Sequence, residues 1–221
     1  MGTAAGLGGA GLIVLFVAGT RIRYLAVSVA ITLLAGSQMV KMDPIRWARI
    51  TAFLDLDANK EGAAWQQWLA IRAFGNGGPT GMGLGNGVVK QMNLPEGHTD
   101  FIFPIIGEEL GVFVTMGVVL CFVVIFLVGL GISMQASDRF GGVLALGITC
   151  ILTIPAMMNL GVTTASLPNT GLPLPFVSYG GSSLIFSFAM IGVLLSILCR
   201  ARKVDVTEMP PVKQKMLEVK L

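Results

Sequence analysis

The chain has 221 residues, of which 54% are hydrophobic and only 12% are charged. Soluble globular domains carry about 25% charged residues, so this composition excludes an ordinary soluble domain and is typical of a membrane protein. The net charge of +3 is small and spread along the chain, which argues against a nucleic-acid-binding surface.

Five apolar stretches are predicted to cross the bilayer as helices, because a spanning helix needs roughly 20 apolar residues. In chain order they are residues 3–20, 24–41, 103–131, 141–165 and 182–199. The sequence therefore predicts an all-α, polytopic membrane protein with about five transmembrane helices. We expect a membrane domain over residues 1–202, followed by a tail of alternating charge over residues 203–221.

Basic residues in the short connections predict the orientation of these helices. They follow the first, third and fifth apolar stretches, at Arg21, Arg23, Arg139, Arg200, Arg202 and Lys203. All of them fall on one side of the membrane, which the positive-inside rule identifies as cytoplasmic. The tail is then cytoplasmic, whereas the polar segment 42–102 and the loop 166–181 are extracytoplasmic. Residue 1 would lie outside, directly before a helix, so we expect the chain to be the C-terminal part of a larger polytopic protein.

The polar segment 42–102 contains two local patterns. In residues 64–74, AWQQWLAIRAF, aromatic, apolar and basic residues recur at helical spacing, which predicts a short interfacial helix with Trp65 and Trp68 at headgroup level. Residues 81–87, GMGLGNG, resemble a phosphate-binding loop but lack both the dinucleotide pattern and a Walker Lys-Ser/Thr. We interpret them as a glycine-rich turn whose amides are able to hold an anion.

The stretch LPEGHTDFIFPIIGEELG, residues 94–111, gathers His98, Asp100, Glu108 and Glu109 just where the chain becomes apolar. Asp100 has two interpretations: it caps the N-terminus of the third helix, or it is a carboxylate at the membrane surface that acts as a base or metal ligand. Glu108 and Glu109 either are solvated near the interface or face a cavity. His98, the only histidine, is interpreted as a loop residue that makes one hydrogen bond.

The stretch LPNTGLPLPFVSYGGSSL, residues 167–184, connects the last two predicted helices. Its three prolines exclude a regular helix, and Ser182 or Ser183 is a suitable N-cap for the helix that follows. Irregular backbone at membrane depth persists only where protein buries it or where it lines a wet cavity. We therefore expect this loop to fold in toward a site.

The stretches 94–111 and 167–184 closely resemble the two signature segments of the SEDS family (shape, elongation, division and sporulation), which includes the RodA and FtsW types. Residues 46–54, RWARITAFL, resemble the family's R-x-x-R-x-x-A-F segment, and residues 81–85 resemble its G-x-G-L-G. Asn159 and Gly161 also match. The resemblance extends to about Arg200, and it implies a ten-helix fold of which this chain corresponds to the last five.

The resemblance also implies a function. SEDS proteins polymerise lipid II into peptidoglycan glycan strands in the bacterial inner (cytoplasmic) membrane, in complex with a class B penicillin-binding protein. The family's essential carboxylate falls on Asp100, either as the base for the attacking hydroxyl or as the group that positions it or a divalent metal ion (Mg²⁺ or Mn²⁺). Arg49 and Lys90 would face the substrate's diphosphate, although both are equally interpretable as solvated cations near headgroups.

Further residues are assigned to substrate binding on the same resemblance: His98, Glu108, Glu109, Ser178, Tyr179 and Ser182. Two other functions stay open beside the glycosyltransferase. A lipid II flippase would need charges deep in several helices, and only the third predicted helix carries them. A non-catalytic fragment or scaffold would still bind the class B penicillin-binding protein.

Overall fold

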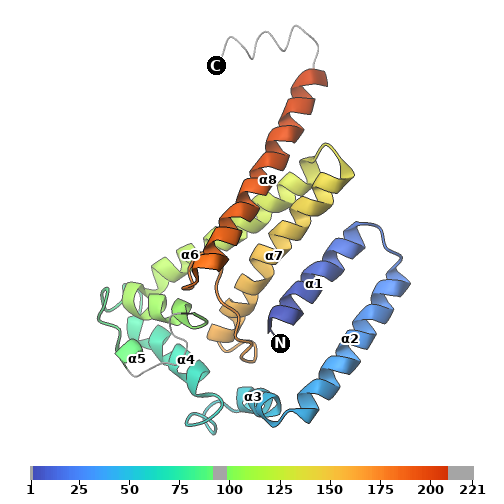
Figure 1. Ribbon diagram of the computed structural model, residues 1–221. Coiled ribbons are helices and arrows are strands. Elements are labelled where there is room, and N and C mark those ends of the chain that lie inside the picture. The colour runs from blue at the N-terminus through green and yellow to red at the C-terminus, as the bar shows by residue number, and fades with distance from the viewer. Residues whose placement is uncertain (1, 92–98, 209–221) are drawn as a thin grey trace.

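The computed structural model describes residues 2–91 and 99–208, without the side chains of residues 90, 91 and 203–208. Every regular element in these ranges is an α-helix, which confirms the predicted all-α class (Figure 1). The helices are α1 (Gly2–Val17), α2 (Ile22–Met42), α3 (Pro44–Leu54), α4 (Trp65–Gly77), α5 (Val88–Gln91), α6 (Ile102–Gln135), α7 (Arg139–Thr163) and α8 (Gly181–Glu208).

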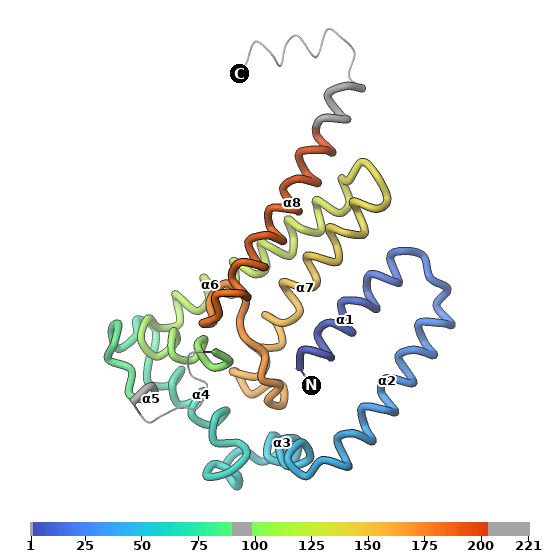
Figure 2. Tube along the Cα trace, viewed as in Figure 1, coloured from blue at the N-terminus to red at the C-terminus, as the bar shows by residue number. Residues whose placement is uncertain are grey.

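Helix α7 forms the centre of the bundle. Half of its most apolar window is buried, compared with 17% for α6, 11% for α8 and 6% for α2. Helices α6 and α8 pack against it and bury an apolar cluster that includes Ile132, Ile148 and Leu194. Helix α1 runs along α7, and α2 stands outermost, in contact with α1 and α3 (Figure 2).

Four helices are long and apolar enough to cross a membrane: α2, α6, α7 and residues 181–202 of α8. The chain is therefore a multi-pass membrane protein, and four of the five predicted spans have the required length. The remaining one, α1, has 16 residues. At 1.5 Å per residue it is about 24 Å long, which is shorter than the hydrocarbon core of a bilayer. Pro155 does not interrupt α7.

Small residues allow the helices to approach α7 closely. On α1, Gly2, Gly6 and Ala10 are buried at a spacing of four residues, which places them on one face of the helix. On α6, a Cβ added to Gly129 would overlap the Thr149 hydroxyl, so only glycine fits at this crossing. Such small-residue contacts are the usual means by which membrane helices pack without large side chains between them.

Helix α6 is broken at Gly111, where φ is +80° and ψ is 179°. Residues 78–83 insert beside this break and pair with the backbone groups that it frees. The amides of Met82 and Gly83 donate to the carbonyls of Glu108 and Glu109, at 2.9 Å each, and the Val112 amide donates to the Gly78 carbonyl at 3.0 Å. The predicted continuous helix over 103–131 is therefore wrong at this point.

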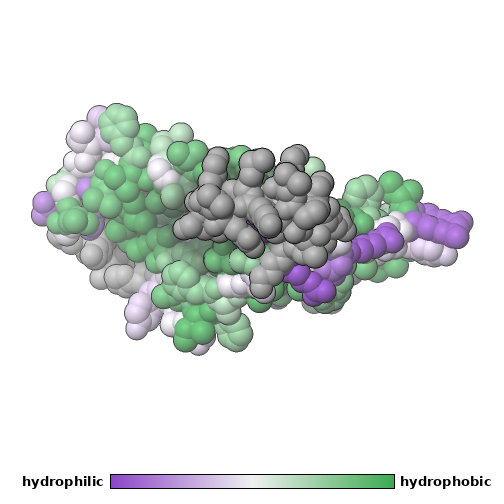
Figure 3. Space-filling view, turned by 90° about the horizontal axis from the view of Figure 1, so that it is seen from above, coloured by the Kyte–Doolittle hydropathy of each residue, from purple (hydrophilic) through white to green (hydrophobic). Residues whose placement is uncertain are grey.

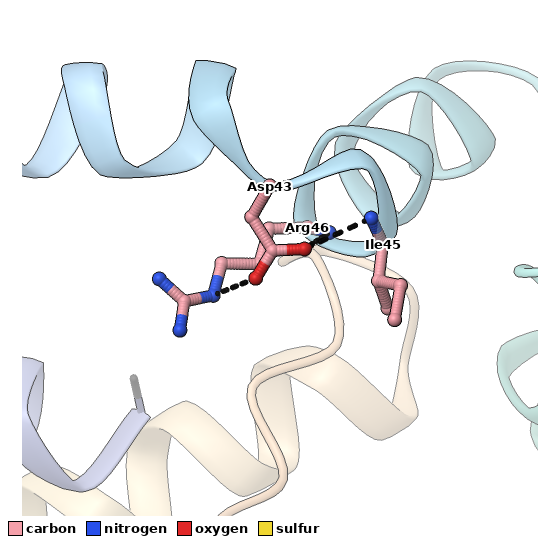
Figure 4. A network of polar contacts seen from close by, with 3 residues as sticks. All are labelled: Asp43, Ile45 and Arg46. Carbon is pink, nitrogen blue, oxygen red and sulfur yellow. Dashed lines mark hydrogen bonds and ion pairs between the residues drawn. The ribbon is translucent and has the colours of Figure 1, made fainter.

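The polar segment between α2 and α6 lies at one end of the bundle. It begins with Asp43, which caps α3 by accepting from the amides of Ile45 and Arg46 and which pairs with the Arg46 Nε at 2.8 Å (Figure 4). Helix α4 packs its Leu69 face against α6 and α7. The predicted short helix at 64–74 is confirmed, and its stacked Trp65 and Trp68 are partly buried against the protein.

The short connections lie at the opposite end of the bundle from α3, α4 and α5 (Figure 1). Arg139, at the start of α7, donates to the Ala18 carbonyl at the end of α1. The α1–α2 and α6–α7 connections, which both carry basic residues, are therefore in contact. Viewed from above, most of the surface that is coloured by hydropathy is hydrophobic (Figure 3). Helix α8 continues to Glu208, so the first residues of the predicted tail are helical.

Candidate active site

Asp100 lies at the junction between the polar segment and α6, and it is half-buried. The N-cap residue of α6 is Phe101, so the interpretation of Asp100 as the N-cap is wrong. Phe101 and Phe103 are buried on either side of the turn, with exposed fractions of 1% and 4%. These aromatic side chains anchor the junction in the core and leave Asp100 at its rim.

The loop between α7 and α8 folds against Asp100, as the sequence predicts. Gly171 has φ +66°, and a Cβ added to it would lie 3.3 Å from Asp100 Oδ2. The carboxylate therefore rests directly against the backbone of the loop at Gly171. Leu172 and Leu174, which are buried, hold the loop in the protein on the far side of this contact.

Two polar side chains tie this loop to the residues at the junction. The Asn159 amide nitrogen donates to the carbonyls of Asp100 and Leu172, at 2.6 Å each. The Ser178 hydroxyl donates to the Thr99 carbonyl at 2.6 Å and accepts from the Leu174 amide at 2.7 Å. The predicted substrate-binding residue Ser178 thus has its hydrogen on a backbone carbonyl.

The other predicted residues of this loop are exposed. Tyr179 is 85% exposed, and nothing in the described part of the chain covers it. Helix α8 begins at Gly181, so Ser182 and Ser183 lie inside its first turn and neither is its N-cap. The assignment of Tyr179 and Ser182 to substrate stays a prediction.

Arg49 lies on the exposed face of α3, beside the same loop. It borders a pocket of about 210 Å³ together with Arg46, Asn169 and Thr170. Arg46 already pairs with Asp43, whereas no acidic side chain among the described residues pairs with Arg49. The Thr170 hydroxyl is buried and has no hydrogen-bond partner among the described residues. Since Thr170 precedes Gly171, the pocket and the Asp100 carboxylate adjoin the same stretch of loop.

Glu108 and Glu109 are buried rather than solvated, with exposed fractions of 0% and 7%. Glu108 accepts from the Asn76 side chain at 2.9 Å and from the Val89 amide at 3.1 Å. A Cβ added to Gly87 would lie within 3.1 Å of both carboxyl groups, so they line the glycine-rich turn from inside. The interpretation that they are solvated near the interface is therefore wrong.

The remaining predicted site residues are described only in part or not at all. Lys90 belongs to the short helix α5, and its side chain is not described. His98 lies outside the described residues. Within the described ranges, no three His, Cys, Asp or Glu side chains gather closely enough to hold a metal ion.

Sequence reasoning missed the structural roles of two buried amides. Besides Asn159, Gln67 on α4 is buried and donates to the carbonyls of Val162 and Leu167, at 3.0 and 2.8 Å. Next to it, Gln66 accepts from Asn169 at 2.7 Å. A carboxamide inside an apolar helix was the available signal for Asn159, because such a group must find partners when it is buried.

Comparison with known proteins gives consistent matches. The chain is 42% identical over 202 residues to a probable peptidoglycan glycosyltransferase FtsW of Geobacter metallireducens, covering 91% of this chain and 54% of that protein. It is 39% identical over 197 residues to the stage V sporulation protein E of Bacillus subtilis, covering 89% and 54%. The chain thus spans about half the length of these curated relatives.

The fold also matches a solved structure. A chain from a peptidoglycan synthase complex superimposes with a TM-score of 0.67 at 23% identity, covering 87% of this chain and 53% of that one. At this identity the match shows the shared fold alone. The family model described as the FtsW, RodA and SpoVE cell cycle proteins matches residues 1–203. The chain therefore belongs to the FtsW/RodA/SpoVE family.

Proposed function

We propose that this chain is the catalytic part of a peptidoglycan glycosyltransferase that polymerises lipid II into glycan strands. The observation that carries the proposal is the placement of Asp100. Its carboxylate rests against the Gly171 backbone, and the same loop borders the pocket of Arg49. A base and a cation that border the same loop are the two groups that transfer of a sugar from a diphosphate requires.

In this proposal Asp100 accepts the proton of the attacking sugar hydroxyl. The hydroxyl oxygen forms the new bond to the anomeric carbon of the donor sugar, while the bond from that carbon to the diphosphate breaks. The undecaprenyl diphosphate leaves with the bonding electrons, and Arg49 stabilises its negative charge. Lys90 is assigned the same role, and His98, Tyr179 and Ser182 remain assigned to the surrounding cavity. The burial of Glu108 and Glu109 favours a structural role for these two acids.

A divalent metal ion, Mg²⁺ or Mn²⁺, is part of the proposal, and Asp100 is the residue that would hold it. Such ions prefer oxygen ligands, and Mg²⁺ is often held by one or two carboxylates together with substrate phosphates. Asp100 would supply one carboxylate, and the substrate would have to bring most of the other oxygens. When bound, the ion would neutralise charge on the diphosphate.

We further propose that the end of the bundle with α3, α4 and α5 faces outward from the bacterial inner membrane and that the tail is cytoplasmic. The basic connections at the opposite end support this orientation. A class B penicillin-binding protein is proposed as partner, in keeping with the synthase complex whose chain shares this fold.

The test is polymerisation of purified lipid II by the native full-length protein with its class B partner. Asp100→Asn should lower the rate by about 100-fold or more, since a general base contributes 10² to 10⁴. Asp57→Asn is the matched control, because Asp57 is an exposed acid in the same segment. An Asp100→Asn protein that polymerises at the wild-type rate would refute the assignment.

The two alternative functions predict a different result in the same assay. A wild-type protein that makes no polymer, but moves fluorescent lipid II across vesicles, is a flippase. One that does neither, but binds the class B protein, is a scaffold.

A further inference from the structure

The Asn159 side chain connects three separate segments of the chain. It projects from the last turns of α7 and is 2% exposed. Its one amide nitrogen has two hydrogens, and both are used: one on the carbonyl of Asp100 and one on that of Leu172, at 2.6 Å each. A single buried group thus fixes the main chain at Asp100 relative to the loop against which the carboxylate rests.

Ser178 makes a second connection one residue earlier. Its hydroxyl donates to the Thr99 carbonyl and accepts from the Leu174 amide, at 2.6 and 2.7 Å. The loop is therefore held to two consecutive peptide groups, those of residues 99 and 100. Two consecutive anchors fix the orientation of the main chain at Asp100, whereas one alone would leave it free to rotate.

The sequence explains why the carbonyl at Asp100 needs a donor from a side chain. Asp100 precedes the N-cap Phe101, so its carbonyl lies outside the hydrogen-bond ladder of α6. The residue four positions later, Pro104, has no N–H that a longer helix could offer to it. The Asn159 amide supplies the donor instead.

We propose that Asn159 and Ser178 are positioning residues, which act through the main chain at residues 99 and 100 to hold the Asp100 carboxylate in place for glycosyl transfer. This inference rests on the proposed function. The proposal replaces the substrate contact that the resemblance implies for Ser178, because its hydroxyl is occupied by Thr99 and Leu174. A displacement of about 1 Å is able to lower a rate by about 100-fold, so such anchors are sufficient to decide catalysis.

The hydrogen bonding of Asn159 supports a role beyond packing. Its Oδ1 atom is buried and has no hydrogen-bond partner among the described residues. An unpartnered buried acceptor lowers stability, so a leucine, which has the same branching and no polar atom, would suit an apolar helix better. An asparagine at this position supplies the two N–H donors that bind the carbonyls of Asp100 and Leu172, which a leucine lacks.

The experiment compares variants that remove these links with variants that remove an equally buried hydrogen bond elsewhere. Asn159→Leu removes both donors and keeps the number and branching of the side-chain heavy atoms, and Ser178→Ala removes the second link. The controls are Thr153→Val on α7 and Ser187→Ala on α8, whose buried hydroxyls bond only within their own helices. Ser178→Thr keeps the hydroxyl and serves as the rescue variant.

The expected result is a selective loss of kcat for lipid II polymerisation. Asn159→Leu should lower kcat about 10- to 100-fold, and Ser178→Ala about tenfold, while KM stays within about twofold. Ser178→Thr should recover most of the rate, and both controls should resemble wild type. In an Asp100→Asn background, neither variant should lower the remaining rate further, since both act through Asp100.

Hydrogen exchange provides a readout that does not depend on activity. The Leu174 amide should exchange faster in Ser178→Ala than in Ser187→Ala, because Ser178 Oγ is its acceptor. Losses of kcat no larger than in the two controls would overturn the inference, as would a rise in KM with kcat unchanged. If wild type makes no polymer, the proposed function fails separately, and unchanged exchange at residues 99–103 and 174 would then overturn the anchoring itself.

Discussion

Helix α6 meets the polar segment at two junctions, and they are built in opposite ways. At the first, residues 99–104, side chains from α7 and from the following loop hold the main chain, and the carboxylate of Asp100 stays half-exposed. At the second, residues 107–112, the main chain of a glycine-rich turn holds the helix, and the carboxylates of Glu108 and Glu109 are buried.

The difference between the junctions gives separate environments to acids that lie within one short stretch of the sequence. A carboxylate that reacts must reach a substrate, and only the first junction leaves its acid at the surface. The acids of the second junction point into the protein, where Glu108 accepts from Asn76 and Val89. We infer that the second junction serves folding and the first serves chemistry, and the variants below test that division from the largest expected effect to the smallest.

The largest effect is expected at the break in α6. Gly111→Val forces a branched side chain into φ +80°, and its Cβ would lie within 2.6 Å of backbone atoms of residues 79–81. The free energy of unfolding should fall by about 3 kcal/mol or more. Thermal unfolding in detergent measures this change. Gly117→Ala is the control on the same helix, because no atom lies within 4 Å of an added Cβ, and it should not destabilise the protein.

A smaller loss of stability is expected from the buried carboxylate. Glu108→Leu leaves the buried Val89 amide without its acceptor, which should cost about 1–3 kcal/mol. Glu108→Gln keeps one acceptor oxygen and should lose less. The exposed Glu61 provides the control Glu61→Leu, which should match wild type. The rate per folded molecule should stay near that of wild type in all three, and a 100-fold loss in Glu108→Gln would contradict the division between the junctions.

A substitution in the pocket beside the first junction should lower activity and leave the stability of the fold unchanged. Arg49→Gln removes the cation that borders the loop at residues 168–170, so kcat/KM for lipid II should fall about tenfold, as for loss of one charge-assisted hydrogen bond. Arg23→Gln, at the opposite end of the bundle, is the control. Equal losses in the two variants would show that general charge, rather than this pocket, is responsible.

The smallest effect is expected at the start of α3. Asp43→Ala removes the cap that accepts from the amides of Ile45 and Arg46, and it should lower stability by about 1 kcal/mol. Differential scanning calorimetry would measure the shift beside Asp57→Ala, an exposed acid that caps no helix. An unchanged midpoint would mean that α3 is held by other contacts.

The sequence predicts the long helices well because their signal is local. Residues 24–41 and 141–165 correspond to Ile22–Met42 and Arg139–Thr163, since apolar length alone defines them. The break at Gly111 has no such local signal. Its backbone groups are satisfied by residues 78–83, about thirty positions earlier in the chain. Nothing within the stretch GEELG distinguishes that outcome from a continuous helix.

Some parts of the candidate site were predictable from the sequence and others were not. The two signature segments identify Asp100 and the loop that meets it, and the structure brings them into contact. The anchoring by Asn159 and Gln67 was not predictable, because their partners are backbone carbonyls, and any residue type supplies a carbonyl. A carboxamide in the apolar helix α7 signals that Asn159 needs partners, but the sequence does not say which carbonyls they are.

The anchors of Asp100 have a consequence for the order of synthesis. Asn159, which binds the Asp100 carbonyl, lies 59 positions later in the chain, and Ser178, which binds the Thr99 carbonyl, lies 79 positions after Thr99. A further link joins Gln67 to Leu167, which lies 100 positions later. A nascent chain that has emerged from the ribosome only as far as α6 contains the carboxylate but none of these partners. The Asp100 carboxylate therefore acquires its fixed position only when the loop after α7 has been inserted. Until then, an unfinished protein in the membrane lacks the assembled site that we propose for catalysis.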